Sequence, residues 1–148
     1  MNRKSAIIVD LDGTLTNCDH RVHFLREHPK DWVSFFEGLI HDEINPWCDQ
    51  IISAMKKAGH QIILMTGRSR DYEELTIKWL KDHQVHFDLL LMRAERDFRS
   101  DSVIKRELYD QYVVGEYEAL FVIEDRQSVV AMWRELGLTC LQCAVGDF

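Results

Sequence analysis

Short apolar runs alternate with amphipathic stretches along most of the chain. The first run covers residues 5–11 (SAIIVDL), and similar runs follow at residues 61–65, 87–92, 119–123 and 138–144. All of them are short and rich in aliphatic side chains, which is typical of strands that are buried on both faces of a parallel sheet. The pattern therefore predicts about five parallel strands.

Between these runs, hydrophobic residues recur with helical spacing. One helix is predicted to start at Pro46, which suits the first helical position, and to end before Gly59, with Trp47 in its buried stripe. Asp71 and Glu74 have the spacing of a capping box, which predicts the start of a second helix. Two further helices are predicted over residues 101–113 and 129–136.

The alternation of strands and helices determines the predicted fold class. It indicates a Rossmann-like α/β fold, in which helices flank a parallel sheet of about five strands. Neither a linker nor a repeat interrupts the pattern, so residues 1–148 are predicted to form a single domain.

Residues 17–43 are the exception to this alternation. The segment follows the first predicted strand and is rich in aromatic residues, among them Trp32, Phe35 and Phe36. Open α/β sheets bind ligands beyond the carboxyl ends of their strands, so we interpret the segment as a small cap or lid inserted over that edge. An extra pair of helices packed on the core fits the pattern equally well.

Composition and charge narrow the functional classes. The 148 residues are 46% hydrophobic and 29% charged, which is ordinary for a globular protein. No apolar run is long enough to cross a bilayer and the N-terminus does not resemble a signal peptide, so we expect a cytoplasmic protein without membrane partners. The formal net charge of −7 disfavours nonspecific binding of nucleic acid, although arginines gather locally at residues 93–99.

Carboxylates gather where two of the predicted strands end. Asp10 and Asp12 follow the first strand, and Glu124 and Asp125 follow the fourth. The ends of parallel strands converge on one crevice, so these side chains are expected to lie close together. Carboxylates at such short range repel one another unless a cation lies among them, and carboxylate oxygens suit Mg²⁺. The sequence therefore predicts a magnesium site.

Phosphate-binding groups are predicted at the same edge of the sheet. Thr66, Gly67 and Arg68 end the second strand, and Lys105 lies in the helix that follows the third. A hydroxyl and a lysine match the oxygen atoms of a phosphate. A metal, a phosphate site and a spare carboxylate together are typical of phosphoryl transfer.

The motifs DLDGT, MTGR, Lys105 and IED, in this order, resemble the four motifs of the haloacid dehalogenase superfamily. The resemblance implies that Asp10 is a nucleophile that forms an aspartyl-phosphate, and that Asp12 acts as general acid and base. It also implies that Thr66 and Lys105 hold the phosphoryl oxygens. Asp125, Asp10 and the backbone carbonyl of Asp12 would bind Mg²⁺.

A closer resemblance covers residues 122–148 and the basic stretch before Lys105. Both are similar to the phosphatase domain of phage-type polynucleotide kinase-phosphatases, a family that removes 3′-phosphates from nucleic-acid ends. Glu124 stands where that family has an aspartate, which leaves Asp125 as the surer metal ligand and Glu124 as a candidate to support it. The substrate-binding residues implied by the resemblance are Arg21, Gly67, Arg68, Arg93, Arg99 and Asp101.

Three functions remain open from the sequence. The chain is a polynucleotide 3′-phosphatase acting on DNA or RNA ends, a phosphatase for small phosphomonoesters such as nucleotides, or a non-catalytic binding module. The paired acids and Lys105 favour an enzyme, and the arginines favour a polynucleotide substrate. The chain lacks the G-x-x-x-x-G-K-[ST] motif of a kinase, so we expect no kinase activity from it, and a kinase or ligase could exist as a separate polypeptide.

The aromatic residues of the insert also have two interpretations. Trp32, Phe35 and Phe36 either pack the lid, which is the simpler account, or stack on a terminal base.

Overall fold

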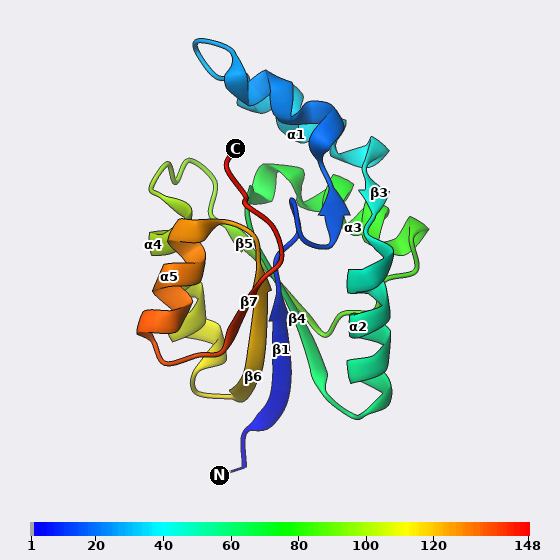
Figure 1. Ribbon diagram of the computed structural model, residues 1–148, viewed down its shortest axis with the longest axis vertical. Helices are drawn as coiled ribbons and strands as arrows, with labels where there is room; N and C mark the ends of the chain where they lie inside the picture. The colour runs from blue at the N-terminus through cyan, green and yellow to red at the C-terminus, as the bar shows by residue number, and fades with distance from the viewer. Residues whose placement is uncertain (1) are drawn as a thin grey trace.

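The computed structural model describes residues 2–148 and contains one central parallel sheet (Figure 1). The strand order is β5-β4-β1-β6-β7, and every neighbouring pair is parallel. Strand β1 is thus in the middle of the sheet, and the helices on both faces of the sheet bury its side chains, in agreement with its continuous apolar run. The five strands are β1 (Lys4–Val9), β4 (Gln61–Ser69), β5 (Leu89–Arg93), β6 (Tyr117–Glu124) and β7 (Cys140–Gln142).

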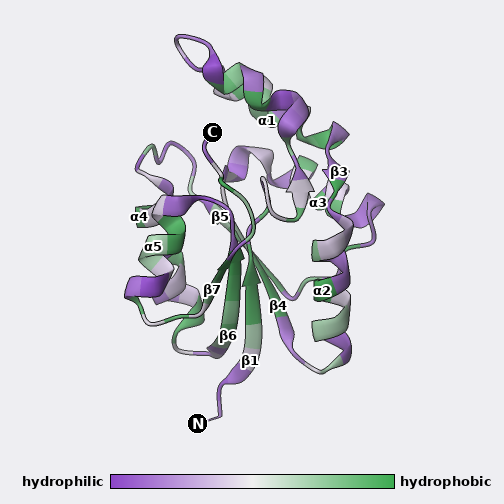
Figure 2. Cartoon of the chain, viewed as in Figure 1, coloured by the Kyte–Doolittle hydropathy of each residue, from purple (hydrophilic) through white to green (hydrophobic). Residues whose placement is uncertain are grey.

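Helices cover both faces of the sheet, which confirms the predicted α/β fold. Alternate residues of β1 point to opposite faces, as the pleat of a strand requires. Ile7 belongs to the core shared with Trp79 of α3, whereas Ile8 belongs to the core shared with Trp133 of α5. Figure 2 shows the strands as hydrophobic between mixed helices. The helices are α2 (Pro46–Lys57), α3 (Glu73–Asp82), α4 (Asp101–Leu108) and α5 (Gln127–Glu135), and a π-helical turn, η4 (Tyr109–Val113), continues α4.

Two local predictions about the helices are wrong. Trp47 is 42% exposed, because the buried stripe of α2 runs through Cys48 and Ile52, and Trp47 lies about 100° away from it on the helix. Asp71 does not cap α3: it lies in the 3-10 turn η3 (Arg70–Tyr72), where its own N–H donates to Ser69 Oγ at 3.1 Å. The N-cap of α3 is Tyr72, which makes no side-chain cap.

The segment after β1 forms a separate layer above the carboxyl edge of the sheet (Figure 1). Its stem is a two-stranded antiparallel ribbon, in which Thr16 pairs with Ile44 and Asn17 with Glu43. The elements of the segment are β2 (Thr16–Asn17), η1 (Asp19–Arg26), α1 (Trp32–Glu37), η2 (Gly38–His41) and β3 (Glu43–Ile44).

Among residues 2–148, none of the helices has the length and apolarity that crossing a membrane requires.

Candidate active site

The carboxyl ends of β1, β4 and β6 bring the predicted site residues together. Asp10 directly follows β1, Thr66 lies within β4, and Asp125 directly follows β6. The chain turns sharply after Asp10, and Gly13 adopts a φ of +82°, a conformation that side chains other than glycine rarely tolerate. A β-carbon on Gly13 would also collide with the carboxylate of Asp125. The glycine therefore allows the two strand ends to approach each other.

Asp10, Glu124 and Asp125 form a compact acidic cluster. One oxygen atom of each carboxylate lies within 4.8 Å of the others, and all three residues are buried. Lys105 Nζ reaches the cluster from α4 and donates to Asp10 Oδ1 and to Glu124 Oε1, both at 2.7 Å. Thr14 Oγ1 lies 3.3 Å from both Asp10 Oδ2 and Asp125 Oδ1. The cluster thus contains three carboxylates but a single ammonium group.

This excess of carboxylates perturbs the protonation of the cluster. Burial and the charge of Asp10 raise the pKa of Asp125 to about 8, and the same two causes raise the pKa of Glu124 well above its usual value. Burial also acts against the ionised form of Asp10, but the charge of Lys105 and hydrogen bonds from neighbouring side chains together outweigh it and lower the pKa of Asp10. Closely spaced carboxylates whose charge is only partly balanced suit a small divalent cation, so the residues present fit Mg²⁺.

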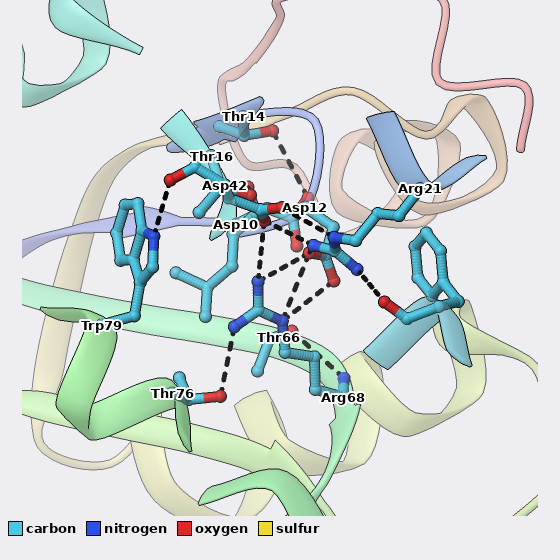
Figure 3. Close-up of polar contacts among 12 residues, drawn as sticks. Asp10, Asp12, Thr14, Thr16, Arg21, Asp42, Thr66, Arg68, Thr76 and Trp79 are labelled. Carbon is cyan, nitrogen blue, oxygen red and sulfur yellow. Dashed lines mark hydrogen bonds and ion pairs between the residues drawn. The ribbon is translucent and has the colours of Figure 1, made fainter. Parts of the chain in front are cut away.

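A second group of charges lies beyond the turn that follows Asp10, and it contains two arginines and two aspartates (Figure 3). We call the two arginines, Arg21 and Arg68, the arginine pair. Asp12 accepts hydrogen bonds from Nη2 of both arginines, the one from Arg68 at 2.7 Å. Asp42 accepts two hydrogen bonds from the Arg21 guanidinium: Nε donates to Oδ1 at 2.7 Å and Nη2 donates to Oδ2 at 2.6 Å. Arg68 Nη1 also donates to Thr76 Oγ1 at 3.1 Å. Two arginines therefore balance two aspartates in this group.

The arginine pair fixes the charge of Asp12. Burial acts to raise the pKa of this carboxyl, but the guanidinium groups of Arg68 and Arg21 outweigh it and hold the pKa well below its usual range. Both arginines are almost fully buried, so their side chains are held in one position by packing as well as by hydrogen bonds.

Gly67, Arg93 and Asp101 form a third group at the ends of β4 and β5. Arg93 Nε donates to Gly67 O at 2.7 Å, and its Nη2 donates to Asp101 Oδ1 at 2.5 Å. A β-carbon on Gly67 would lie 2.5 Å from the same Asp101 oxygen, so only glycine allows this close approach. Arg99 is separate from this group, because its guanidinium pairs with Asp97 and Glu107 at the surface.

One pocket of about 590 Å³ joins these groups. Every predicted site residue lines it except Arg21, which reaches the site only through its bond to Asp12. Three residues that sequence reasoning missed also belong to the site: Asp42, Arg126, whose Nε lies 3.3 Å from Asp101 Oδ2, and Phe148. Arg126 directly follows the IED motif, which was a usable signal. Asp42 gave none, because it lies 21 positions along the chain from Arg21.

Two known proteins resemble this chain over most of its length. A protein of Autographa californica nuclear polyhedrosis virus, named as a bifunctional polynucleotide kinase/RNA ligase, is 29% identical over 141 residues, 90% of this chain and 18% of the viral protein. A chain in the structure of the Pnkp1/Rnl/Hen1 RNA repair complex is 36% identical, with a TM-score of 0.87, over 99% of this chain and 44% of that one. This chain thus spans less than half the length of either relative.

A more distant neighbour shares the fold. The class C acid phosphatase from Bacillus anthracis is 17% identical, with a TM-score of 0.66, over 100% of this chain and 69% of that one. Residues 4–148 match the family described as the polynucleotide kinase PNKP phosphatase domain. The chain therefore belongs to this family of phosphatase domains, within the haloacid dehalogenase superfamily, as its motifs predicted.

Proposed function

We propose that this chain is a magnesium-dependent phosphomonoesterase that acts through an aspartyl-phosphate at Asp10 and removes 3′-phosphates from polynucleotide ends. The observation that carries the proposal is the single pocket in which the acidic cluster, the buried Lys105 and the arginine-bound Asp12 lie together. A buried lysine that balances only part of an acidic cluster is poorly explained by stability alone, because unpaired buried charge is costly.

Asp10 is suited to act as the nucleophile. Lys105 holds one of its oxygens and lowers its pKa, which keeps the carboxylate ionised. In the proposed first step, a carboxylate oxygen of Asp10 forms a bond to phosphorus while the bond from phosphorus to the substrate's 3′-oxygen breaks. Water then attacks the phosphorus of the aspartyl-phosphate, which releases inorganic phosphate and restores Asp10.

Asp12 is proposed to move the protons in both steps. It would protonate the departing 3′-oxygen first and then accept a proton from the attacking water. The arginine pair favours the ionised form of Asp12, which suits the second step directly. For the first step Asp12 must carry a proton, and the negative charge of a phosphate entering the same pocket favours its uptake.

The acidic cluster is proposed to hold Mg²⁺ through Asp10, Asp125 and the backbone carbonyl of Asp12. The bound cation would neutralise the charge that develops on the phosphoryl oxygens. Glu124 is proposed to support this site from the side. One of its oxygens accepts from Lys105 at 2.7 Å and the other from the backbone N–H of Asp125 at 3.2 Å, so both are already in use.

The proposed substrate is a nucleic-acid end, DNA or RNA. Family membership and the names of the two relatives support it, and so does the chemistry of the pocket. Thr66 Oγ1 accepts from the N–H of Arg68 at 3.1 Å, which leaves its own proton free for a phosphoryl oxygen. Arg93 and Arg99 line the same pocket and are proposed to face flanking phosphodiesters.

The proposal also covers the role of the inserted segment and the source of a kinase or ligase activity. Residues 17–43 would act as a cap over a single domain, because they lie above the strand ends and supply Arg21 to Asp12. A kinase or ligase would act on the same ends as a separate polypeptide or a further segment, as the names of the two relatives suggest.

Hydrolysis of small phosphomonoesters is the competing function. It is separated by measuring kcat and KM with a 3′-phosphorylated oligonucleotide, a free 3′-nucleotide and glycerol phosphate, each with Mg²⁺ and with chelator. The proposal expects Mg²⁺-dependent turnover and a clear preference for the oligonucleotide in kcat/KM. Equal kcat/KM for oligonucleotide and nucleotide would assign the small-molecule function instead, and no turnover of any substrate would leave the non-catalytic binding module.

A further inference from the structure

Aromatic side chains from two elements form a continuous surface beside the catalytic groups. Trp32 and Phe36 of α1 are stacked, with ring centroids 5.8 Å apart and planes inclined by 22°. Tyr72, from the turn before α3, continues the row at 5.0 Å from Phe36. All three line the pocket that contains Asp10 and Lys105. We call Trp32, Phe36 and Tyr72 the aromatic row.

The aromatic row is not explained by packing of the insert. Phe35, between the two row residues of α1, has that role: it is buried, lies under the Arg21 guanidinium at 4.3 Å, and accepts a hydrogen bond from Arg21 through its carbonyl at 3.0 Å. Trp32 and Phe36 are four positions apart and so are neighbours on the helix surface, each with an edge contact to Phe35. Trp32 remains 44% exposed, and Phe36 and Tyr72 are half-buried.

The same helix therefore connects the aromatic row to the catalytic groups. Phe35 binds Arg21, Arg21 binds Asp12, and Asp12 lies next to the proposed nucleophile, so the row has a defined position relative to the phosphoryl site. Figure 1 shows α1 above the carboxyl ends of the strands.

The size of the pocket indicates what the row contacts. Its volume of about 590 Å³ is far more than a phosphoryl group fills. Flat, exposed aromatic rings next to a phosphate site match the flat face of a nucleobase, which stacks on such rings whatever its identity. Lys30 Nζ lies 5.5 Å from the Trp32 ring and adds positive charge near a phosphodiester backbone.

We propose that the aromatic row binds the base of the 3′-terminal nucleotide when that nucleotide is unpaired, in a single-stranded end. This inference rests on the proposed phosphatase function. A base that is paired and stacked in a duplex cannot present its face to the row, so the site selects single-stranded 3′ ends. The aromatic row thus determines specificity, whereas the strand ends perform the chemistry.

The test uses two single-stranded oligonucleotides with a 3′-phosphate, identical except that one has an abasic terminal nucleotide. For the wild type, we expect KM to be at least about five-fold lower with the base present, the lower end of base–aromatic stacking. Trp32→Ala and Phe36→Leu should bring the ratio of the two KM values close to one. Tyr112→Ala, which changes an exposed aromatic residue outside the pocket, should leave the ratio as it is in the wild type.

Two results would overturn the base site. In one, the wild type hydrolyses both oligonucleotides with equal KM. In the other, the row variants raise both KM values by the same factor, which would mean that the row only supports the insert. Absence of hydrolysis of every substrate, glycerol phosphate included, would instead contradict the phosphatase function and the base site with it.

A binding measurement is independent of turnover. In the Asp10→Asn background, the intact 3′-phosphorylated oligonucleotide should quench tryptophan fluorescence, and the abasic form should quench it less. Trp32→Phe should remove most of this difference while keeping a ring in the row. Equal quenching by both oligonucleotides would count against the site.

Discussion

The two charged groups on either side of the turn after β1 are built differently. The acidic cluster has three buried carboxylates and one ammonium group, and the pKa values of Glu124 and Asp125 are raised. The arginine pair faces two aspartates, and the pKa of Asp12 is lowered. Opposite charges are thus balanced in one group and unbalanced in the other.

Because of this difference, the arginine pair and its aspartates are neutral without a ligand, whereas the acidic cluster needs a cation or protons to balance its charge. Buried ion pairs hold a defined geometry when all their partners are present, so the arginine pair can orient Asp12 without any addition. The acidic cluster lowers its electrostatic repulsion only when a cation or protons enter it. Metal binding and nucleophilic attack are therefore expected in the cluster, whereas the arginine pair positions Asp12.

The largest expected effect is on the nucleophile. Asp10→Asn should lower kcat on a 3′-phosphorylated oligonucleotide by on the order of 10⁴ or more, because an amide cannot supply the anionic oxygen. The thermal midpoint should change little, since the amide can still accept from Lys105. Retention of more than about a tenth of the wild-type kcat would contradict the aspartyl-phosphate intermediate.

Breaking the arginine pair should mainly affect stability. Arg21→Leu leaves Asp42 and Asp12 short of a buried cation, and removal of one partner from a buried ion pair typically costs about 3–5 kcal/mol. The free energy of unfolding from urea denaturation measures this loss. Arg106→Ala, which removes an exposed pair with Asp110, is the matched control and should cost at most about 1 kcal/mol. Equal losses in the two variants would mean that the buried network adds no more than a surface ion pair.

Metal binding should distinguish the two acids of the IED motif. At a Mg²⁺ concentration one hundred times Kd, a single site stabilises the folded protein by about 2.7 kcal/mol, seen as a rise in thermal midpoint that chelator reverses. Asp125→Ala should abolish this rise, whereas Glu124→Ala should reduce it less, because both Glu124 oxygens already have partners. Loss of the rise in both variants to the same extent would show that both carboxylates bind the cation directly.

The smallest effect is expected at the surface. Arg99 is already paired with Asp97 and Glu107, so its charge is partly used before a substrate arrives. Arg99→Ala should raise KM for an oligonucleotide at low salt and lower the log–log salt slope by at most about 0.7, one phosphate contact on a single strand. A larger change in the slope would mean that Arg99 leaves its carboxylates to contact more than one phosphate.

Arg93→Ala tests whether Arg93, unlike Arg99, has a structural role in the site. Arg93 bonds the carbonyls of Gly67, Asp97 and Arg99, so it holds the loop at residues 93–101 as well as lining the pocket. If it binds only flanking phosphates, KM should rise for oligonucleotides and stay unchanged for a free 3′-nucleotide. A parallel loss with both substrates would identify it as a residue that positions Gly67 and the loop.

The sequence by itself determined the fold class and the position of the chemistry. Hydrophobic runs such as residues 5–11 are local signals, and a chain that alternates such strands with helices forms a parallel sheet whose strand ends meet at one edge. The sequence pattern alone therefore assigns Asp10, Thr66 and Asp125 to one crevice. The family followed from the motifs at those ends.

Only the tertiary structure decided which of these charges pair, and with what. Asp42 meets Arg21 because the β2–β3 ribbon returns the chain to its starting point, and nothing within either local sequence specifies that return. Trp47 faces outward because one helical position separates it from the buried stripe. The roles of Phe35 and Phe36 differ for the same reason: neighbouring positions on α1 point about 100° apart, and what lies in each direction depends on distant parts of the chain.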